Sequence, residues 1–369
     1  PTASEVTEAS SEDDTRAAVG IAATPNSAEA QQQAIAVIEA ARGSIERGTD
    51  DEVVGVQLGF SRITDADMSH VKQLASIRSL RLDGSQISDA GLEHLKQLSN
   101  LETLGLGMTQ ITDSGLEYLK GLRNLRVLYL GSTQTTDSGL EHIGELTNLE
   151  EFYLGDTQVS SVGLPHLSRL TSLQMLQLPG TQVSDEGLKH LEQLSGLQTL
   201  YLGNEVTDVG MEHMKGLPGL QNLYLGGTQV TDAGLEQLKG LANLRTLGLH
   251  GRQVTDAGLM HVKDMTNLKA LMLNRTGVTD IGLEHLQDST ALETLVLQET
   301  QVSDVGLEYL AGLTNLHTLL LQGTQVSDAG LEHLTGLTNL RNLLLQDTQV
   351  TEDCMLKLKT ALPLCLISR

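Results

Sequence analysis

The stretch "LQNLYLGGTQVTDAGLEQLKGL" (residues 220–241) contains two different hydrophobic periodicities, one after the other. Leu223 and Leu225 alternate with outward residues as in a β-strand, and the leucines of residues 235–241 recur every three residues, as on one face of a helix. Asp232 stands directly before the helical run, where its carboxylate would accept hydrogen bonds from the free N–H groups of the first turn. The stretch therefore predicts one strand and one short helix, with Asp232 as the helix N-cap.

This sequence pattern recurs along the chain at an almost constant spacing. The slot of Asp232 returns every 24 residues, as at 232, 256 and 280, apart from a 23-residue step between Asp185 and Asp208. Thirteen units with the consensus L-x-x-L-x-L-x-x-T-Q-V-T-D-x-G-L-x-x-L-x-x-L-x-N run over residues 53–362. Because each unit supplies a strand and a helix, the array predicts an α/β solenoid with a parallel sheet on its concave face and short helices on its convex face.

The consensus resembles that of the leucine-rich repeat family, whose core L-x-x-L-x-L-x-x-N-x-L is matched at residues 101–111, 125–135 and 340–350. The continuation T-D-x-G-L is similar to that of cysteine-type or ribonuclease-inhibitor-like repeats and of many bacterial relatives. Threonine replaces the family's asparagine, as at Thr228, and we expect its hydroxyl to bond the turn of the neighbouring unit. The resemblance implies a right-handed, horseshoe-shaped solenoid that binds other proteins.

Each end of the array needs a capping element that shields the leucines of the terminal unit from solvent. Residues 26–43 predict a helix that begins at Asn26 or Ser27 and ends at Gly43, and with a linker to residue 52 it would cap the first unit. At the other end, residues 363–369 predict a closing strand.

The first 25 residues are acidic and lack periodicity, which predicts a flexible tail. The sequence begins at Pro1, and we expect that an upstream segment such as a signal peptide was removed. That expectation favours an exported or cell-surface location over a cytoplasmic one.

The charge balance excludes some classes of function. The chain has 47 acidic and 24 basic residues and a net charge of -23, whereas nucleic-acid binding needs clustered lysine and arginine. No apolar run approaches the roughly 20 residues of a membrane span. Cys354 and Cys365 could form a disulfide only if their Cα atoms lie within about 7 Å, and we expect free buried thiols instead.

The repeated acids and histidines predict structure rather than chemistry. Paired-carboxylate catalysis needs two acids in different environments, whereas the acids of the capping slot are equivalent. Nine of the 11 histidines stand five residues after that slot, on helices about 8–10 Å apart, too far to share a metal ion. We therefore predict no enzymatic activity, no metal site and no cofactor. A further hypothesis is that histidine protonation near pH 6.5 alters self-association.

Function is expected at positions that the repeat leaves free, above all the central outward position of each strand. This column holds four of the six tyrosines, which would span roughly 20 Å, followed by an apolar stripe that should face open solvent. Such patches are rare on soluble monomers and typical of interfaces, although β-propensity alone could select these residues. The predicted contact residues are Tyr129, Tyr153, Tyr201, Tyr224, Met272, Val296, Leu320 and Leu344.

Two irregularities accompany this column. His250, Arg252 and Arg275, together with Asn274, form a basic spot suited to a carboxylate or phosphate of a partner, and an isolated surface charge pair is the alternative. Within residues 159–208 one unit loses its aspartate and another loses a residue, which either shapes the tyrosine region or has no consequence.

Together these patterns predict a non-enzymatic module that binds a partner protein or peptide on the concave sheet. One alternative is a carbohydrate-binding or surface-adhesion protein whose tyrosines stack on sugars. Another is a structural spacer that uses its convex face or self-association.

Overall fold

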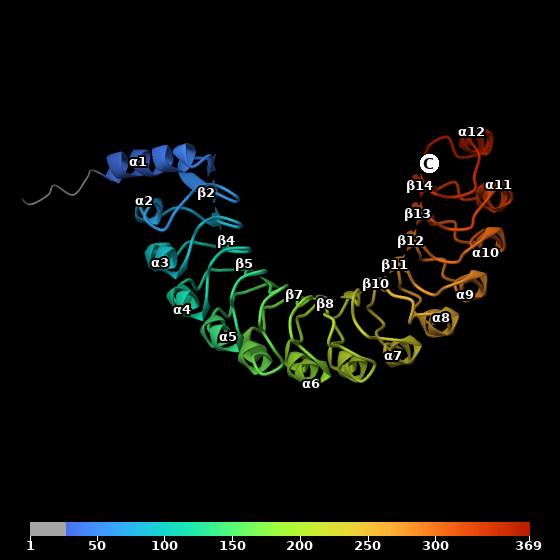
Figure 1. The fold of residues 1–369 in the computed structure, drawn as a ribbon, viewed down its shortest axis with the longest axis horizontal. Helices are drawn as coiled ribbons and strands as arrows, with labels where there is room; N and C mark the ends of the chain where they lie inside the picture. Colours follow the sequence, from blue (N-terminus) through green and yellow to red (C-terminus); the bar gives the residue numbers. More distant parts are fainter. Residues whose placement is uncertain (1–26) are drawn as a thin grey trace, which may run out of the picture.

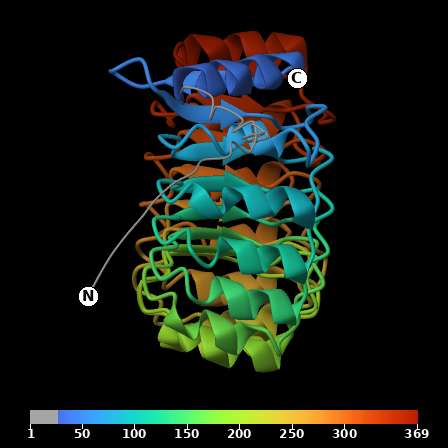
Figure 2. The same ribbon diagram turned by 90° about the vertical axis from the view of Figure 1, so that its left-hand side faces the viewer.

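The computed structural model describes residues 27–369, whose strands and helices form an open arc (Figure 1). The predicted flexible tail at residues 1–25 and the candidate N-cap Asn26 lie outside the described residues. A 15-stranded sheet lines the inner face of the arc, with its strands in chain order, and the helices form the outer face. Seen from the side, the helices of successive units stack one above another (Figure 2). The predicted α/β solenoid is therefore confirmed.

The strands are short, and most have three residues. They are β1 (Ser44–Arg47), β2 (Val53–Gln57), β3 (Ser79–Arg81), β4 (Thr103–Gly105), β5 (Val127–Tyr129), β6 (Glu151–Tyr153), β7 (Met175–Gln177), β8 (Thr199–Tyr201), β9 (Asn222–Tyr224), β10 (Thr246–Gly248), β11 (Ala270–Met272), β12 (Thr294–Val296), β13 (Thr318–Leu320), β14 (Asn342–Leu344) and β15 (Leu366–Ser368).

The outer face combines α-helices with 3₁₀ helices. The α-helices are α1 (Ser27–Ala40), α2 (Met68–Val71), α3 (Asp89–Leu92), α4 (Asp113–Leu116), α5 (Asp137–Ile143), α6 (Asp185–Leu188), α7 (Asp232–Gln237), α8 (Asp256–Val262), α9 (Asp280–Glu284), α10 (Asp304–Glu308), α11 (Asp328–Leu331) and α12 (Glu352–Ala361). The 3₁₀ helices are η1 (Glu93–Gln97), η2 (Glu117–Leu119), η3 (Leu164–Arg169), η4 (Lys189–Gln193), η5 (Gly210–Gly216) and η6 (Glu332–Leu334).

The two ends of the sheet differ from each other. β1 pairs antiparallel with β2, with Ile45 opposite Val56, so part of the segment that we expected to be a linker adds a strand to the N-terminal edge. At the other end, β15 pairs parallel with β14, with Ile367 opposite Leu343, inside the segment predicted as the closing strand. Helix α1 buries its apolar face against the first unit, and its Ile38 is fully buried.

The curvature follows from the unequal widths of the two faces. Parallel strands stand about 4.8 Å apart, whereas packed helices need about 8 to 10 Å, so each unit is wider on its outer side. A continuous leucine core fills the space between sheet and helices, and within residues 220–241 Leu223, Leu235 and Leu238 are all fully buried. The inward positions predicted from the periodicity are therefore confirmed.

The repeated aspartate has a different role from the one predicted. The N-cap of α7 is Thr231, whose hydroxyl accepts a hydrogen bond from the Ala233 N–H, and Asp232 is the first helical residue. Its carboxylate accepts from the next unit instead: the Thr255 N–H donates to Oδ1 at 2.7 Å and the Thr255 hydroxyl donates to Oδ2 at 2.6 Å. The N-cap prediction was wrong because Thr255 of the neighbouring unit presents two donors to this carboxylate. The sequence of one repeat alone does not reveal contacts with the next repeat.

The same two-donor joint recurs along the array. Its acceptor and donor residues are Asp65 and Ser88, Asp89 and Thr112, Asp113 and Thr136, Asp137 and Ser160, Asp185 and Thr207, Asp208 and Thr231, Asp232 and Thr255, Asp256 and Thr279, Asp280 and Ser303, Asp304 and Ser327, and Asp328 and Thr351. One joint uses serine as the acceptor: the Ser184 N–H donates to Ser161 Oγ at 3.0 Å, and the two hydroxyls are also 3.0 Å apart.

From the second unit on, the glycine two residues after the repeated slot makes room for the joint with the preceding unit. A Cβ atom on Gly234 would overlap the carboxylate of Asp208 from that unit, so only glycine lets the two units pack this closely. The last unit departs from the pattern, because Cys354 occupies the glycine slot and α12 extends to ten residues.

The turn threonine bonds within its own unit, not to the neighbouring turn as we predicted. The Thr228 hydroxyl donates to the Leu225 carbonyl at 2.7 Å, three residues earlier. The short side chain meets this local carbonyl before it can reach another unit. A bond between units comes from the asparagine that ends the repeat: the Asn243 side-chain amide donates to the Pro218 carbonyl at 2.9 Å.

We expect Asp232→Ala to lower the free energy of unfolding by about 2 to 3 kcal/mol, because two donors of Thr255 lose their shared acceptor. Asp232→Ser should recover part of the loss, since Ser161 makes the equivalent contacts with Ser184. Denaturant unfolding followed by circular dichroism measures both. Glu236→Ala, on an exposed residue of the same helix, is the control, and an equal loss in the control would contradict the joint's role.

Candidate functional site

The parallel register aligns the predicted concave column in one line across the sheet. Tyr129 lies opposite Tyr153, and Tyr201 lies opposite Tyr224. Their rings form two stacks, with 4.2 Å between the centroids of the first pair and 4.1 Å between those of the second. Gln177 on β7 lies between the two pairs, so the four tyrosines form two separate surfaces.

The first pair, Tyr129 and Tyr153, is here named the closed stack because charged residues occupy both its ends. The guanidinium carbon of Arg81 lies 4.1 Å from the centroid of the Tyr129 ring, and Arg81 Nε donates to Asp83 Oδ2 at 2.7 Å. At the other end the Tyr153 hydroxyl donates to Glu151 Oε2 at 2.8 Å. Burial, followed by this bond with Glu151, raises the pKa of Tyr153. The charged groups around the closed stack are therefore engaged within the sheet.

The second pair, Tyr201 and Tyr224, is named the open stack because its neighbours in the column are uncharged. The two rings are nearly parallel, with an interplanar angle of 4°. Gln177 lies on the neighbouring strand on one side and Gly248 on the other. Burial, followed by hydrogen bonding with Tyr224, raises the pKa of Tyr201 to about 12.

A hollow of ≈ 460 Å³ opens beside the open stack, and we name it the tyrosine hollow. Three of its lining residues are glycines, which leave open the space that side chains would fill. Two other residues that we predicted to contact a partner, Met272 and His250, also line it. The lining residues are Pro179, Tyr201, Leu202, Tyr224, Gly226, Gly227, Gly248, Leu249, His250, Met272 and Asn274.

The irregular units of the repeat lie at the edge of this hollow. The unit of β8 lacks the turn threonine, and its shortened turn closes with the Val206 N–H donating to the Gly203 carbonyl at 3.2 Å. The next unit is hydrogen-bonded to this turn, because the Gln229 side-chain amide donates to the Asn204 carbonyl at 2.8 Å. Leu202, just before the shortened turn, lines the hollow. This placement favours the first of the two interpretations of the deletion, namely that it shapes the tyrosine region.

The apolar end of the column is less open to solvent than we expected. Val296 is only 8% exposed, and Met272, Leu320 and Leu344 are half-buried. The strands are in register, so these side chains are neighbours and cover one another. Of the four, Met272 alone lines the tyrosine hollow.

The predicted basic spot is divided between two environments. His250 and Asn274 line the tyrosine hollow, whereas Arg252 and Arg275 are exposed side chains that do not line it. Arg275 forms a two-point ion pair with Glu299, with Nε 2.9 Å from Oε2 and Nη2 2.8 Å from Oε1. We had not foreseen Glu299 because it stands 24 residues later in the chain, and only the repeat brings it alongside. This pairing weakens the case for an anion site at Arg275.

The concave sheet is electrically different from the rest of the protein. None of the strands from β8 to β14 contains an aspartate, glutamate, lysine or arginine. The whole chain, by contrast, has a net charge of -23. The strands of the C-terminal half of the concave face are therefore uncharged, and charged residues flank them, as Arg245 does before β10 and Lys269 before β11.

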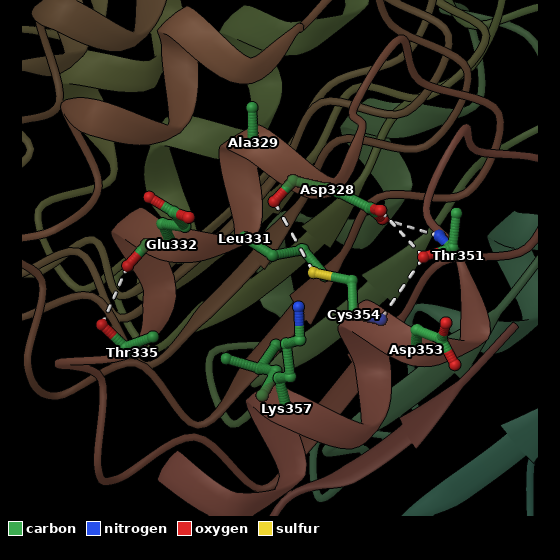
Figure 3. A pocket seen from close by; sticks show the side chains of 10 residues that line it. Asp328, Ala329, Leu331, Glu332, Thr335, Thr351, Asp353, Cys354 and Lys357 are labelled. Atoms are coloured by element: carbon green, nitrogen blue, oxygen red, sulfur yellow. Dashed lines mark hydrogen bonds between the residues drawn. The ribbon is translucent and has the colours of Figure 1, made fainter.

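A second hollow, of ≈ 470 Å³, lies between α11 and α12 near the C-terminus (Figure 3). Asp328, Thr351, Cys354 and Lys357 are among its lining residues. The Cys354 thiol donates to the Asp328 carbonyl at 3.6 Å, and burial raises the pKa of this thiol, which disfavours the reactive thiolate. Both cysteines are free, as predicted, although Cys354 is half-buried and only Cys365 is fully buried. The hollow therefore follows from the terminal helix rather than from a reactive centre.

Within residues 27–369, no cluster of three or more histidine, cysteine, aspartate or glutamate side chains could hold a metal ion. Over the same residues, no helix combines the length and the apolar character needed to cross a membrane. Most residues of the histidine column are half-buried along the outer helices.

Comparisons with known proteins agree with this architecture. A family model described as Leucine Rich repeat matches residues 97–120. An internalin, InlF, from Listeria monocytogenes is 24% identical, with 92% of this chain and 94% of that chain covered and a TM-score of 0.64. A leucine-rich repeat protein of Leptospira interrogans is 20% identical, with 81% and 85% covered and a TM-score of 0.52. At these identities the likeness concerns the fold. No curated protein sequence matches the chain.

We expect Tyr201 to ionise at about pH 12 in an alkaline titration followed by tyrosinate absorbance. Because the pKa in the folded state lies above the ordinary value of 10.0, the associated stabilisation is fully present below that pH and is lost as the pH rises through about 12. Tyr224→Phe removes the hydroxyl that contributes to the raised pKa of Tyr201 and should lower that pKa. Tyr129→Phe, in the closed stack, should leave the Tyr201 transition in place. Tyr201→Phe assigns the transition by difference, and loss of a component near pH 10 in place of one near pH 12 would contradict the burial of Tyr201.

Proposed function

This chain is a leucine-rich repeat protein, and we propose that it acts as a non-enzymatic scaffold that binds a partner protein or peptide on its concave sheet. The observation that carries the proposal is the tyrosine hollow beside the open stack. A concave, mainly apolar recess with a few convergent polar groups is the usual form of a binding site, and tyrosine and methionine are enriched in interface cores.

The two stacks support different roles in this scaffold. The closed stack uses its charged neighbours for contacts within the sheet, as in the pairing of Arg81 with Asp83. The open stack adjoins free space and uncharged strands. We therefore propose that the main contact with the partner consists of Tyr201, Tyr224 and Met272. The apolar side chains that continue the column as far as Leu344 form a secondary contact.

The alternative of a carbohydrate ligand has weaker support. A sugar ring carries hydroxyls around its edge, and each would need a polar partner once it leaves water. Among the side chains that line the hollow, His250, Asn274 and the tyrosine hydroxyls are the polar ones. One face of each tyrosine ring is also covered by the other ring of the stack.

We expect a Tyr201→Ala/Tyr224→Ala variant to lose at least about 2 kcal/mol of binding free energy for its partner, because tyrosines at the centre of an interface commonly act as hot spots. Affinity capture from the source organism, with the unmodified protein and the variant side by side, identifies the proteins that depend on these rings. Titration calorimetry with each then measures the loss.

The matched control is Tyr118→Ala/Tyr309→Ala, which removes two tyrosines that pack against the core on the helical side. Circular dichroism must show the native spectrum for both double variants. If both variants retain the same partners with the same affinities, concave-face binding is wrong.

A further inference from the structure

The closed stack contains an internal example of what fits beside a tyrosine pair. Gly105 separates Arg81 from Tyr129 in the column, and a Cβ atom at Gly105 would overlap the side chains of Arg81 and Asp83. The missing side chain lets the Arg81 guanidinium cross a whole strand and lie against the Tyr129 ring, 4.1 Å from its centroid. A glycine next to a tyrosine pair therefore forms a seat that a guanidinium fills.

The open stack has a related arrangement without an arginine from its own sheet. Tyr201 covers one face of Tyr224, and the Tyr224 ring leans over Gly248 on the other side, where a Cβ atom would come within 2.8 Å of Tyr224 Cδ1. The next strand offers Met272 in place of an arginine. Tyr224, Gly248 and Met272 all line the tyrosine hollow, and we name these three residues the empty seat.

The charge of the protein favours a cation at this position. A net charge of -23 attracts cationic segments from a distance, and the strands from β8 to β14 contain no basic residue that would repel one locally. Of the basic side chains nearby in the sequence, Lys269 is paired with Glu293 and Arg275 with Glu299. Two more, Arg245 and Arg252, are exposed and do not line the hollow. A guanidinium suits a tyrosine face better than an ammonium, because it is planar and more weakly hydrated.

We propose that the partner inserts an arginine side chain into the empty seat, so that the hollow selects a cationic, arginine-bearing protein segment. This inference rests on the proposed concave-face function and specifies its ligand. The guanidinium lies in the hollow against the Tyr224 face that Tyr201 leaves free, with the Met272 thioether on its other side, as Arg81 lies against Tyr129 in the closed stack.

The first test uses short acetylated and amidated peptides that carry one variable residue between glycines. Arginine, lysine, citrulline and phenylalanine versions are titrated against the full chain at slightly alkaline pH, so that protonated histidine does not enter the comparison. Ring signals of isotope-labelled tyrosine report on the site by NMR. We expect the arginine peptide to shift the signals of Tyr201 and Tyr224 and to bind about tenfold more tightly than the citrulline peptide.

Two pairs of variants localise the effect. Tyr224→Leu removes the ring face and should abolish the arginine preference, whereas Tyr129→Leu, in the closed stack, should retain it. Met272→Arg supplies a guanidinium from the neighbouring strand, as Arg81 does in the closed stack, and should block the peptide. Ala257→Arg adds the same charge on the outer helix α8, away from the concave sheet, and should leave the affinity within about twofold.

The outcomes separate this inference from the proposed function. Equal binding of the arginine and citrulline peptides, no binding by any peptide, or full binding by Tyr224→Leu would each overturn the arginine seat, while the capture experiment still decides concave-face binding. Shifts of the Tyr201 and Tyr224 signals by maltohexaose but not by the arginine peptide would overturn both. An arginine preference that disappears in Tyr224→Leu and Met272→Arg, and persists in both controls, supports the seat.

Discussion

One contact sets the relation between neighbouring units at all but one of the joints: an aspartate at the start of one helix accepts two hydrogen bonds from the serine or threonine that precedes the next. Asp232 and Thr255 form such a joint. Hydrogen bonds to a charged acceptor are roughly twice as strong as neutral ones, and here a backbone donor and a side-chain donor converge on one group. The following glycine column exists because the carboxylate needs its space, as Gly234 provides for Asp208.

This construction leaves the concave face free for other tasks. The leucine core fixes the inward positions, and the aspartate joints fix the start of each helix. The outward strand positions are held only by backbone pairing, so their side chains can differ from unit to unit without disturbing the array. The two tyrosine stacks show how much this freedom allows: the same residue pair is enclosed by charge at Tyr129 and open at Tyr224.

The periodic part of the molecule could be predicted from the sequence, and the contacts between units could not. Strand and helix positions follow from spacing, so Leu223 and Leu235 were placed correctly. The partners of Asp232 and Thr228 were not, because each polar side chain has several donors or acceptors within reach and the choice depends on sub-ångström packing. The column of tyrosines was also visible, but its division into two stacks depends on Gln177. The enclosure of the first stack depends on Arg81 reaching past Gly105, and both effects appear only after the strands are aligned.

The serine joint between the units of β6 and β7 has a consequence for the mechanics of the arc. In a solenoid each unit contacts only its neighbours, so the resistance to bending is the sum of local stiffnesses. Ser161 offers a neutral hydroxyl where the other joints offer a carboxylate, and it lies between the closed stack and the open stack. A weaker joint at this place would let the arc bend there most easily, and the distance between the two tyrosine pairs would then change with that bending.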